Sequence, residues 1–137
     1  MPWNAKHNET LQLIEVVYTG LTTARDLQEA TSKCIAMGKE KGINRFLVDS
    51  EGLELSASFV DVFDLCDKKY TAEKADRLSR IAVVLPSSTE AQEVAHFYET
   101  VCRNRGWMAN VVSTRQEAID WLLSRKLSNK PAASEGL

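Results

Sequence analysis

The stretch from Arg80 to Leu123 constrains the fold most, because short apolar runs alternate there with segments of helical periodicity. Arg80-Ile-Ala-Val-Val-Leu85 is one such run, bounded by turn residues, and Met108–Val112 is another. Runs of this kind are typical of strands buried on both faces, and two of them separated by a helix indicate a parallel βαβ unit. The stretch therefore predicts an α/β fold.

Earlier segments extend this pattern to a whole domain. β-branched and alternating apolar residues predict three further strands, the first two forming a hairpin, at residues 3–6, 11–18 and 45–49. A loop is expected at residues 50–58, and helical spacing with hydroxyl caps predicts helices at about 20–42, from 59 onward, 87–106 and 114–123. We expect one domain over residues 1–125, a mixed, mostly parallel five-stranded sheet with four or five helices, and a disordered tail at 126–137.

Composition places the chain among ordinary globular proteins and excludes several partner classes. The net charge of −2 over 137 residues predicts no strong attraction to nucleic acid. The longest apolar runs fall far short of the roughly 20 residues that span a bilayer, so no stable membrane insertion is expected. Residues 1–9 contain no apolar signal core, which favours a cytoplasmic location.

The three cysteines show no pattern of a disulfide framework or a metal site. Cys34, Cys66 and Cys102 are spread through the chain without a Cys-x-x-Cys pair or a nearby histidine. Each falls in a different expected helix. We expect all three to be small buried apolar residues.

No catalytic, metal or cofactor pattern is present. The chain lacks both the Gly-x-Gly-x-x-Gly turn of dinucleotide-binding proteins and the phosphate loop ending in Gly-Lys-Ser/Thr. His7 and His96 have no nucleophile beside them in the expected fold. Asp49 ends a strand as in phospho-receiver domains, but the acidic pair and the lysine of such domains are missing. We therefore expect a protein without enzymatic activity, metal or cofactor.

The ends of the strands offer the best place for a ligand or partner. In open α/β sheets, ligands bind beyond the carboxyl ends of the strands. The expected loop from Asp49 to Ser58 lies there, and it leads into an acidic helix. The candidate ligand or partner residues are Asp49, Ser50, Glu51, Gly52 and Phe59.

Several motifs resemble those of one known family. They are Tyr18-Thr-Gly20, Phe46-Leu-Val-Asp49, Arg80-Ile-Ala-Val-Val84 and Glu117-Ala-Ile-Asp-Trp-Leu122. With the order of the expected elements, they resemble the SpoIIAA-like family, which belongs with STAS domains and is loosely related to the CRAL-TRIO lipid-binding fold. The resemblance spans about residues 11–123 and implies a STAS-like architecture.

The resemblance also implies a candidate phosphorylation site. Anti-sigma-factor antagonists of the STAS group are switched by phosphorylation of a serine at the start of the second helix. Ser58 lies closest to that position, and Ser56 is the neighbouring candidate. The aspartate before the serine and the glycine after it are absent from Ser56-Ala-Ser-Phe-Val60.

Two functions follow from these observations. The first is a non-enzymatic regulatory or protein-interaction module of the STAS type, controlled by phosphorylation at Ser58 or Ser56. The alternative is a carrier that binds a small apolar or anionic molecule, or a lipid, in a groove near the carboxyl ends of the strands. An exposed first strand carrying Trp3 favours a homodimer.

Overall fold

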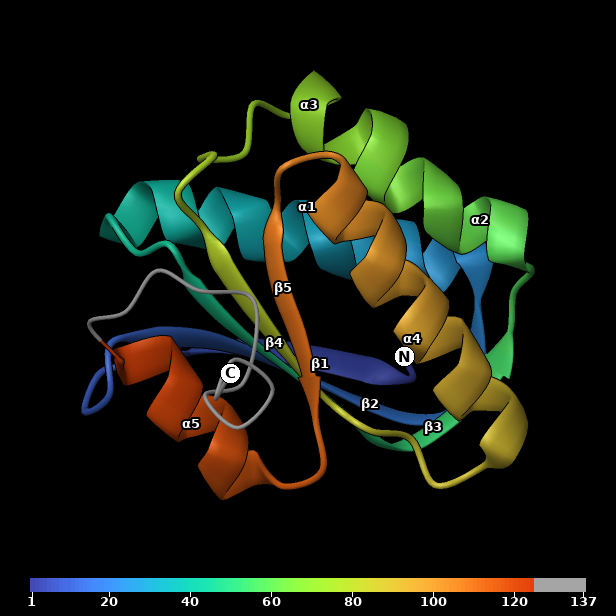
Figure 1. Ribbon diagram of the computed structural model, residues 1–137. Coiled ribbons are helices and arrows are strands. Elements are labelled where there is room, and N and C mark those ends of the chain that lie inside the picture. Colours follow the sequence, from blue (N-terminus) through green and yellow to red (C-terminus); the bar gives the residue numbers. More distant parts are fainter. Residues whose placement is uncertain (125–137) are drawn as a thin grey trace, which may run out of the picture.

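A computed structural model describes residues 1–124 and confirms the mixed α/β fold (Figure 1). The strands lie in the order β1-β2-β3-β4-β5; β1 pairs antiparallel with β2, and the remaining neighbours pair in parallel. The expected tail at 126–137 lies outside the described residues. The elements are β1 (Trp3–Asn8), β2 (Leu13–Thr23), α1 (Ala24–Lys41), β3 (Arg45–Ser56), α2 (Phe59–Asp64), η1 (Leu65–Lys69), α3 (Tyr70–Ala72), β4 (Arg80–Val84), α4 (Thr89–Asn104), β5 (Met108–Val112) and α5 (Arg115–Leu123).

The predicted loop at residues 50–58 is wrong for most of its length, because β3 continues to Ser56. The end of β3 pairs with the end of β2, where Thr19 lies opposite Gly52 after a break in register. Leu53 and Leu55 pack against the core while Glu54 and Ser56 are exposed, the alternation of a strand with one buried face. The two strands thus run past the rest of the sheet as a paired ribbon.

The helices cover the two faces of the sheet unequally (Figure 1). Side chains from α1, α2, η1, α3 and α4 share one core with the sheet, and α5 covers the other face with a smaller core. The smaller core consists of Leu13, Leu47, Ala82, Val84, Ala118 and Leu122. The larger one holds all three cysteines, as expected from the sequence.

Hydroxyl side chains start the helices where the sequence predicts them. Thr23, Ser58 and Thr114 each form a capping box with an acidic residue three positions on. Gly42 ends α1 with φ of 68°, a left-handed conformation that costs glycine little.

Residues 59–72 form a cover segment over the larger core. The segment consists of α2, the π-helical turn η1 and α3, and it packs on α4. Just beyond it, the carboxylate of Glu73 accepts a hydrogen bond of 2.7 Å from the Ser32 hydroxyl on α1. The helix predicted from residue 59 onward ends at Ala72. Because the cover segment packs on α4 and the residue after it, Glu73, binds α1, the segment spans from α4 toward α1.

Candidate ligand-binding cavity

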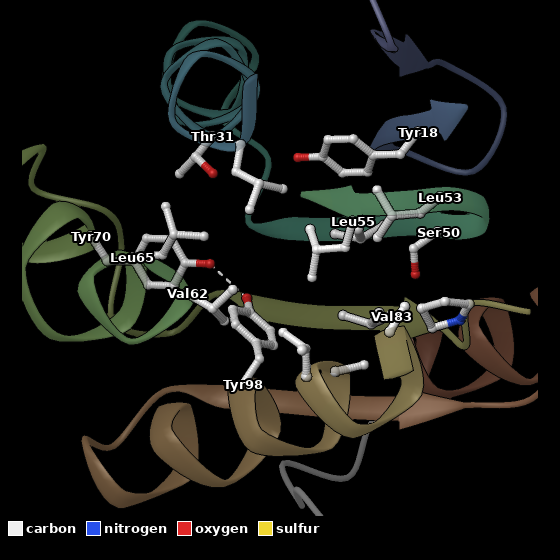
Figure 2. A pocket seen from close by; sticks show the side chains of 16 residues that line it. Tyr18, Thr31, Ser50, Leu53, Leu55, Val62, Leu65, Tyr70, Val83 and Tyr98 are labelled. Carbon is white, nitrogen blue, oxygen red and sulfur yellow. Dashed lines mark hydrogen bonds between the residues drawn. The ribbon is translucent and has the colours of Figure 1, made fainter. Parts of the chain in front are cut away.

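An apolar cavity of about 100 Å³ lies between the sheet, α1, the cover segment and α4 (Figure 2). Aliphatic side chains from β3, β4 and the helices around it form most of its wall. The lining residues are Tyr18, Leu27, Thr31, Val48, Ser50, Leu53, Leu55, Val62, Leu65, Tyr70, Val83, Pro86, Ala91, Val94, Ala95 and Tyr98. A wall of this composition favours an apolar occupant.

A second cavity of about 70 Å³ adjoins the first one. Tyr18, Thr31, Val48 and Tyr70 line both cavities, so only these side chains separate the two spaces. An engineered apolar cavity of about 150 Å³ binds benzene or xenon. Each of the two spaces is smaller than that, so a small ring compound requires movement of the side chains that line both.

Three tyrosines supply polar groups to the cavity, in addition to the hydroxyls of Thr31 and Ser50. The hydroxyls of Tyr70 and Tyr98 lie 2.6 Å apart and satisfy each other. Burial raises the pKa of Tyr18, Tyr70 and Tyr98 above the usual value for tyrosine, so all three hydroxyls keep their protons at neutral pH. The cavity consequently contains hydrogen-bonding groups but no charge.

Tyr18 differs from the other two tyrosines. Its hydroxyl points into the cavity from β2, in the direction of Thr31 on α1 (Figure 2). Within residues 1–124, no hydrogen bond satisfies this hydroxyl, although the residue is only 6% exposed. The oxygen of this hydroxyl is not fully enclosed by protein, so a ligand atom or a water molecule can bond to it.

A surface groove of about 500 Å³ lies beside the cavity. Leu55, Ala91 and Val94 line both the groove and the cavity, so these side chains lie between the two spaces. Its other lining residues are Leu21, Glu54, Ala57, Phe59, Ser88, Glu90 and Glu93. The groove thus combines apolar and acidic side chains, and the acidic ones disfavour an anionic ligand.

The predicted partner residues Asp49, Ser50, Glu51 and Gly52 lie on β3 instead of on a loop, and they do not act together. The Ser50 side chain is buried and lines the cavity, but its hydroxyl already donates to the Val84 carbonyl at 2.5 Å. The carboxylate of Asp49 accepts from the Glu51 amide at 3.1 Å. Glu51 and Gly52 are exposed, and none of these three residues lines the cavity or the groove.

Phe59 and the two candidate phosphoacceptors lie at the groove end of the molecule. Phe59 is 47% exposed, lines the groove, and contacts Phe97 edge to face with ring centroids 5.0 Å apart. Ser58 is exposed, but its hydroxyl caps α2 and lies 3.0 Å from the Asp61 carboxylate. Ser56 is exposed at the end of β3.

The sequence gives no sign that the three tyrosines form a group. Helical spacing places Tyr98 on the sheet side of its helix, whereas Tyr70 lies in a charged interval at residues 67–77. The only local signal was an aromatic residue on each of three separate elements. Their convergence depends on how the cover segment packs, which local periodicity does not encode.

A separate ion pair lies on the opposite face of the sheet. The carboxylate of Glu15 on β2 is 1% exposed, and the Arg115 guanidinium on α5 binds it through two hydrogen bonds of 2.7 and 2.9 Å. These bonds hold the pKa of Glu15 below its usual value despite the opposing effect of burial. The pair joins the start of α5 to the sheet.

No metal or membrane site is visible in the described part of the chain. Over residues 1–124, no three side chains of His, Cys, Asp or Glu lie close enough to hold a metal ion together. None of the helices in that range is both long enough and apolar enough to cross a bilayer. His96 is exposed on α4 beside Glu99, far in sequence from His7 on β1.

Comparison of the chain with protein-family models, curated proteins and solved structures finds no match. The resemblance to the SpoIIAA-like family therefore stays a prediction from the sequence. The molecule itself has an apolar cavity and an acidic groove beside it. A tyrosine hydroxyl in the cavity has no hydrogen-bond partner among residues 1–124.

Proposed function

We propose that this domain binds a small, uncharged and largely apolar molecule in the cavity beneath the cover segment. The Tyr18 hydroxyl carries the proposal, because it faces an apolar space and has no hydrogen-bond partner among residues 1–124. A ligand with one polar atom satisfies this hydroxyl while its apolar part fills the space. This corresponds to the carrier alternative, with a neutral ligand replacing an anionic one because of Glu54, Glu90 and Glu93.

The test is binding of benzene, phenol, indole and benzoate, measured by thermal unfolding and by chemical-shift changes. A probe at roughly tenfold its Kd stabilises the folded state by about 1.4 kcal/mol, which corresponds to a rise in Tm of about 3–6 °C. We expect this rise with phenol or indole, a smaller one with benzene and none with benzoate. Replacing Tyr18 by phenylalanine should abolish the preference for phenol over benzene.

Two neighbouring positions on α4 provide the matched variants. Ala95 is 9% exposed and lines the cavity, so Ala95→Leu should fill part of it and abolish the probe-induced rise in Tm. The His96 side chain is 59% exposed, so His96→Leu adds a leucine to the solvent side and should leave binding intact. Binding of no probe, or equal binding by both variants, would contradict the proposal.

The second candidate is a regulatory module that docks a protein, and one observation favours it. Leu21, Phe59 and Val60 are large apolar side chains exposed at 63%, 47% and 67% beside the acidic groove. We propose a basic, apolar segment as the partner, with control by phosphorylation of Ser58. A phosphate there adds up to two negative charges next to the Asp61 carboxylate, which weakens the cap and changes the charge of the groove.

An affinity-capture experiment from cell extract tests this second candidate. We expect a protein that binds the wild-type domain and Ser56→Asp but not Ser58→Asp, because only Ser58 caps α2. Identical partners for all three proteins would contradict control at Ser58. Capture of no protein, or no effect of Phe59→Ser on capture, would contradict docking in the groove.

A further inference from the structure

The sulfur atoms of Cys66 and Cys102 lie 2.8 Å apart in the larger core. Cys66 is on η1 and 1% exposed, and Cys102 is on α4 and fully buried. This separation is only about 0.8 Å longer than a disulfide bond. The two side chains thus already point at each other from different elements.

A second contact fixes the same two elements in this register. The Tyr70 and Tyr98 hydroxyls meet at 2.6 Å, four residues after Cys66 and four residues before Cys102. The two helical segments therefore run in opposite directions, with a cysteine pair and a tyrosine pair facing across the same seam. Because residues four apart lie on one face of a helix, a bond between the sulfurs requires little movement of the backbone.

Cys34 shows that burial alone does not produce this arrangement. It is buried on α1 and lines the smaller cavity, but it makes no sulfur contact among residues 1–124. Regular spacing in the sequence suggests three equivalent cysteines, whereas the structure pairs two of them and leaves the third apart.

We propose that Cys66 and Cys102 form a reversible disulfide that locks the cover segment to α4. In the reaction with a low-molecular-weight disulfide such as oxidised glutathione, each cysteine loses its proton and one S–S bond forms between them. The two electrons pass to the oxidant, whose S–S bond breaks to give two thiols. This inference goes beyond ligand binding, since the bond forms whether or not the cavity is occupied.

Burial controls the rate of the reaction. It raises the pKa of the Cys102 thiol and keeps both sulfurs from an oxidant the size of glutathione. Oxidation of the folded protein must therefore wait for transient separation of η1 from α4. The same burial protects the bond from reduction once it has formed.

Refolding in a glutathione redox buffer tests the proposal, because both thiols are accessible in the unfolded chain. We expect a product about 2 Da lighter than the reduced protein, with one disulfide that peptide mapping assigns to Cys66 and Cys102. Cys34→Ser should give the same bond, and Cys66→Ser should give no intramolecular bond. Wild type and Cys34→Ser decide the question even if Cys66→Ser does not fold.

The bond should also stabilise the fold, because it joins residues 36 positions apart in the sequence. We expect the Tm of the oxidised protein to exceed that of the reduced protein by about 5–10 °C. Free thiols at both positions in the most oxidising buffer, persistent glutathione adducts there, or a bond to Cys34 would overturn the proposal.

Discussion

Replacing Arg115 by methionine is expected to lower the free energy of unfolding by about 2–3 kcal/mol at pH 7. The change leaves the Glu15 carboxylate, which is 1% exposed, without its two charged hydrogen bonds. Loss of one partner from a fully buried pair costs about 3–5 kcal/mol. The value here is lower because the Arg115 side chain is 45% exposed and solvent screens the pair.

The cost should depend on pH with a defined sign. Since the folded-state pKa of Glu15 lies below its unfolded value, the pair stabilises the protein fully above the unfolded pKa of about 4.3. This contribution disappears as the pH falls through the lowered folded value. In Arg115→Met, protonation of Glu15 relieves the unpaired charge, so the difference from wild type should shrink as the pH decreases from 6 toward 3.

Urea unfolding at several pH values measures this difference. Arg25→Met is the control, because it breaks a pair with Glu29 whose side chains are 87% and 47% exposed, and it should cost less than about 0.5 kcal/mol. The double variant Glu15→Met/Arg115→Met should be more stable than Arg115→Met, since it leaves no buried charge. A cost for Arg115→Met that is equal to the control and independent of pH would show that the pair contributes nothing.

Replacing Leu122 by alanine should cost about 3–4 kcal/mol. Leu122 is fully buried in the smaller core between α5 and the sheet, where it packs with residues such as Leu47 and Val84. Among residues 1–124, α5 is the one helix on this face, so no neighbouring helix fills the space that the substitution leaves. Arg80 donates hydrogen bonds to the carbonyls of Trp121 and Leu122, so α5 stays partly attached.

The adjacent residue supplies the control. Leu123 is 39% exposed, and Leu123→Ala should cost less than about 1 kcal/mol. Chemical denaturation of both variants gives the comparison, and amide hydrogen exchange should report local opening of α5 in Leu122→Ala. Equal costs for the two substitutions would contradict the assignment of Leu122 to the core between α5 and the sheet.

Local patterns were enough to predict most of the elements. The strands at 80–84 and 108–112 consist mainly of apolar residues, and the hydroxyl caps expected at the helix starts are found at Thr23 and Thr114. These signals operate within a few residues of the chain. Tertiary packing stabilises the helices and strands that these signals predict and does not convert one kind of element into the other.

The candidate site was predicted only in part, because its features depend on contacts between distant segments. Residues 50–56 contain Ser-Glu-Gly, a turn-like composition, but they become a strand because the end of β2 lies beside them. Ser50 belongs to the expected loop and Phe59 to the start of the helix after it; the first lines the cavity and the second lines the groove. The unsatisfied Tyr18 hydroxyl had no counterpart in the sequence argument.

The sequence by itself determined the fold class, the helix starts and the burial of the three cysteines, since periodicity, caps and composition act locally. Only the tertiary structure decided which polar groups meet. Packing of the cover segment on α4 pairs Cys66 with Cys102 and Tyr70 with Tyr98, and it encloses the space that Tyr18 enters. Such pairings depend on the distance between residues far apart in the chain, and the spacing of residue types along one segment does not specify that distance.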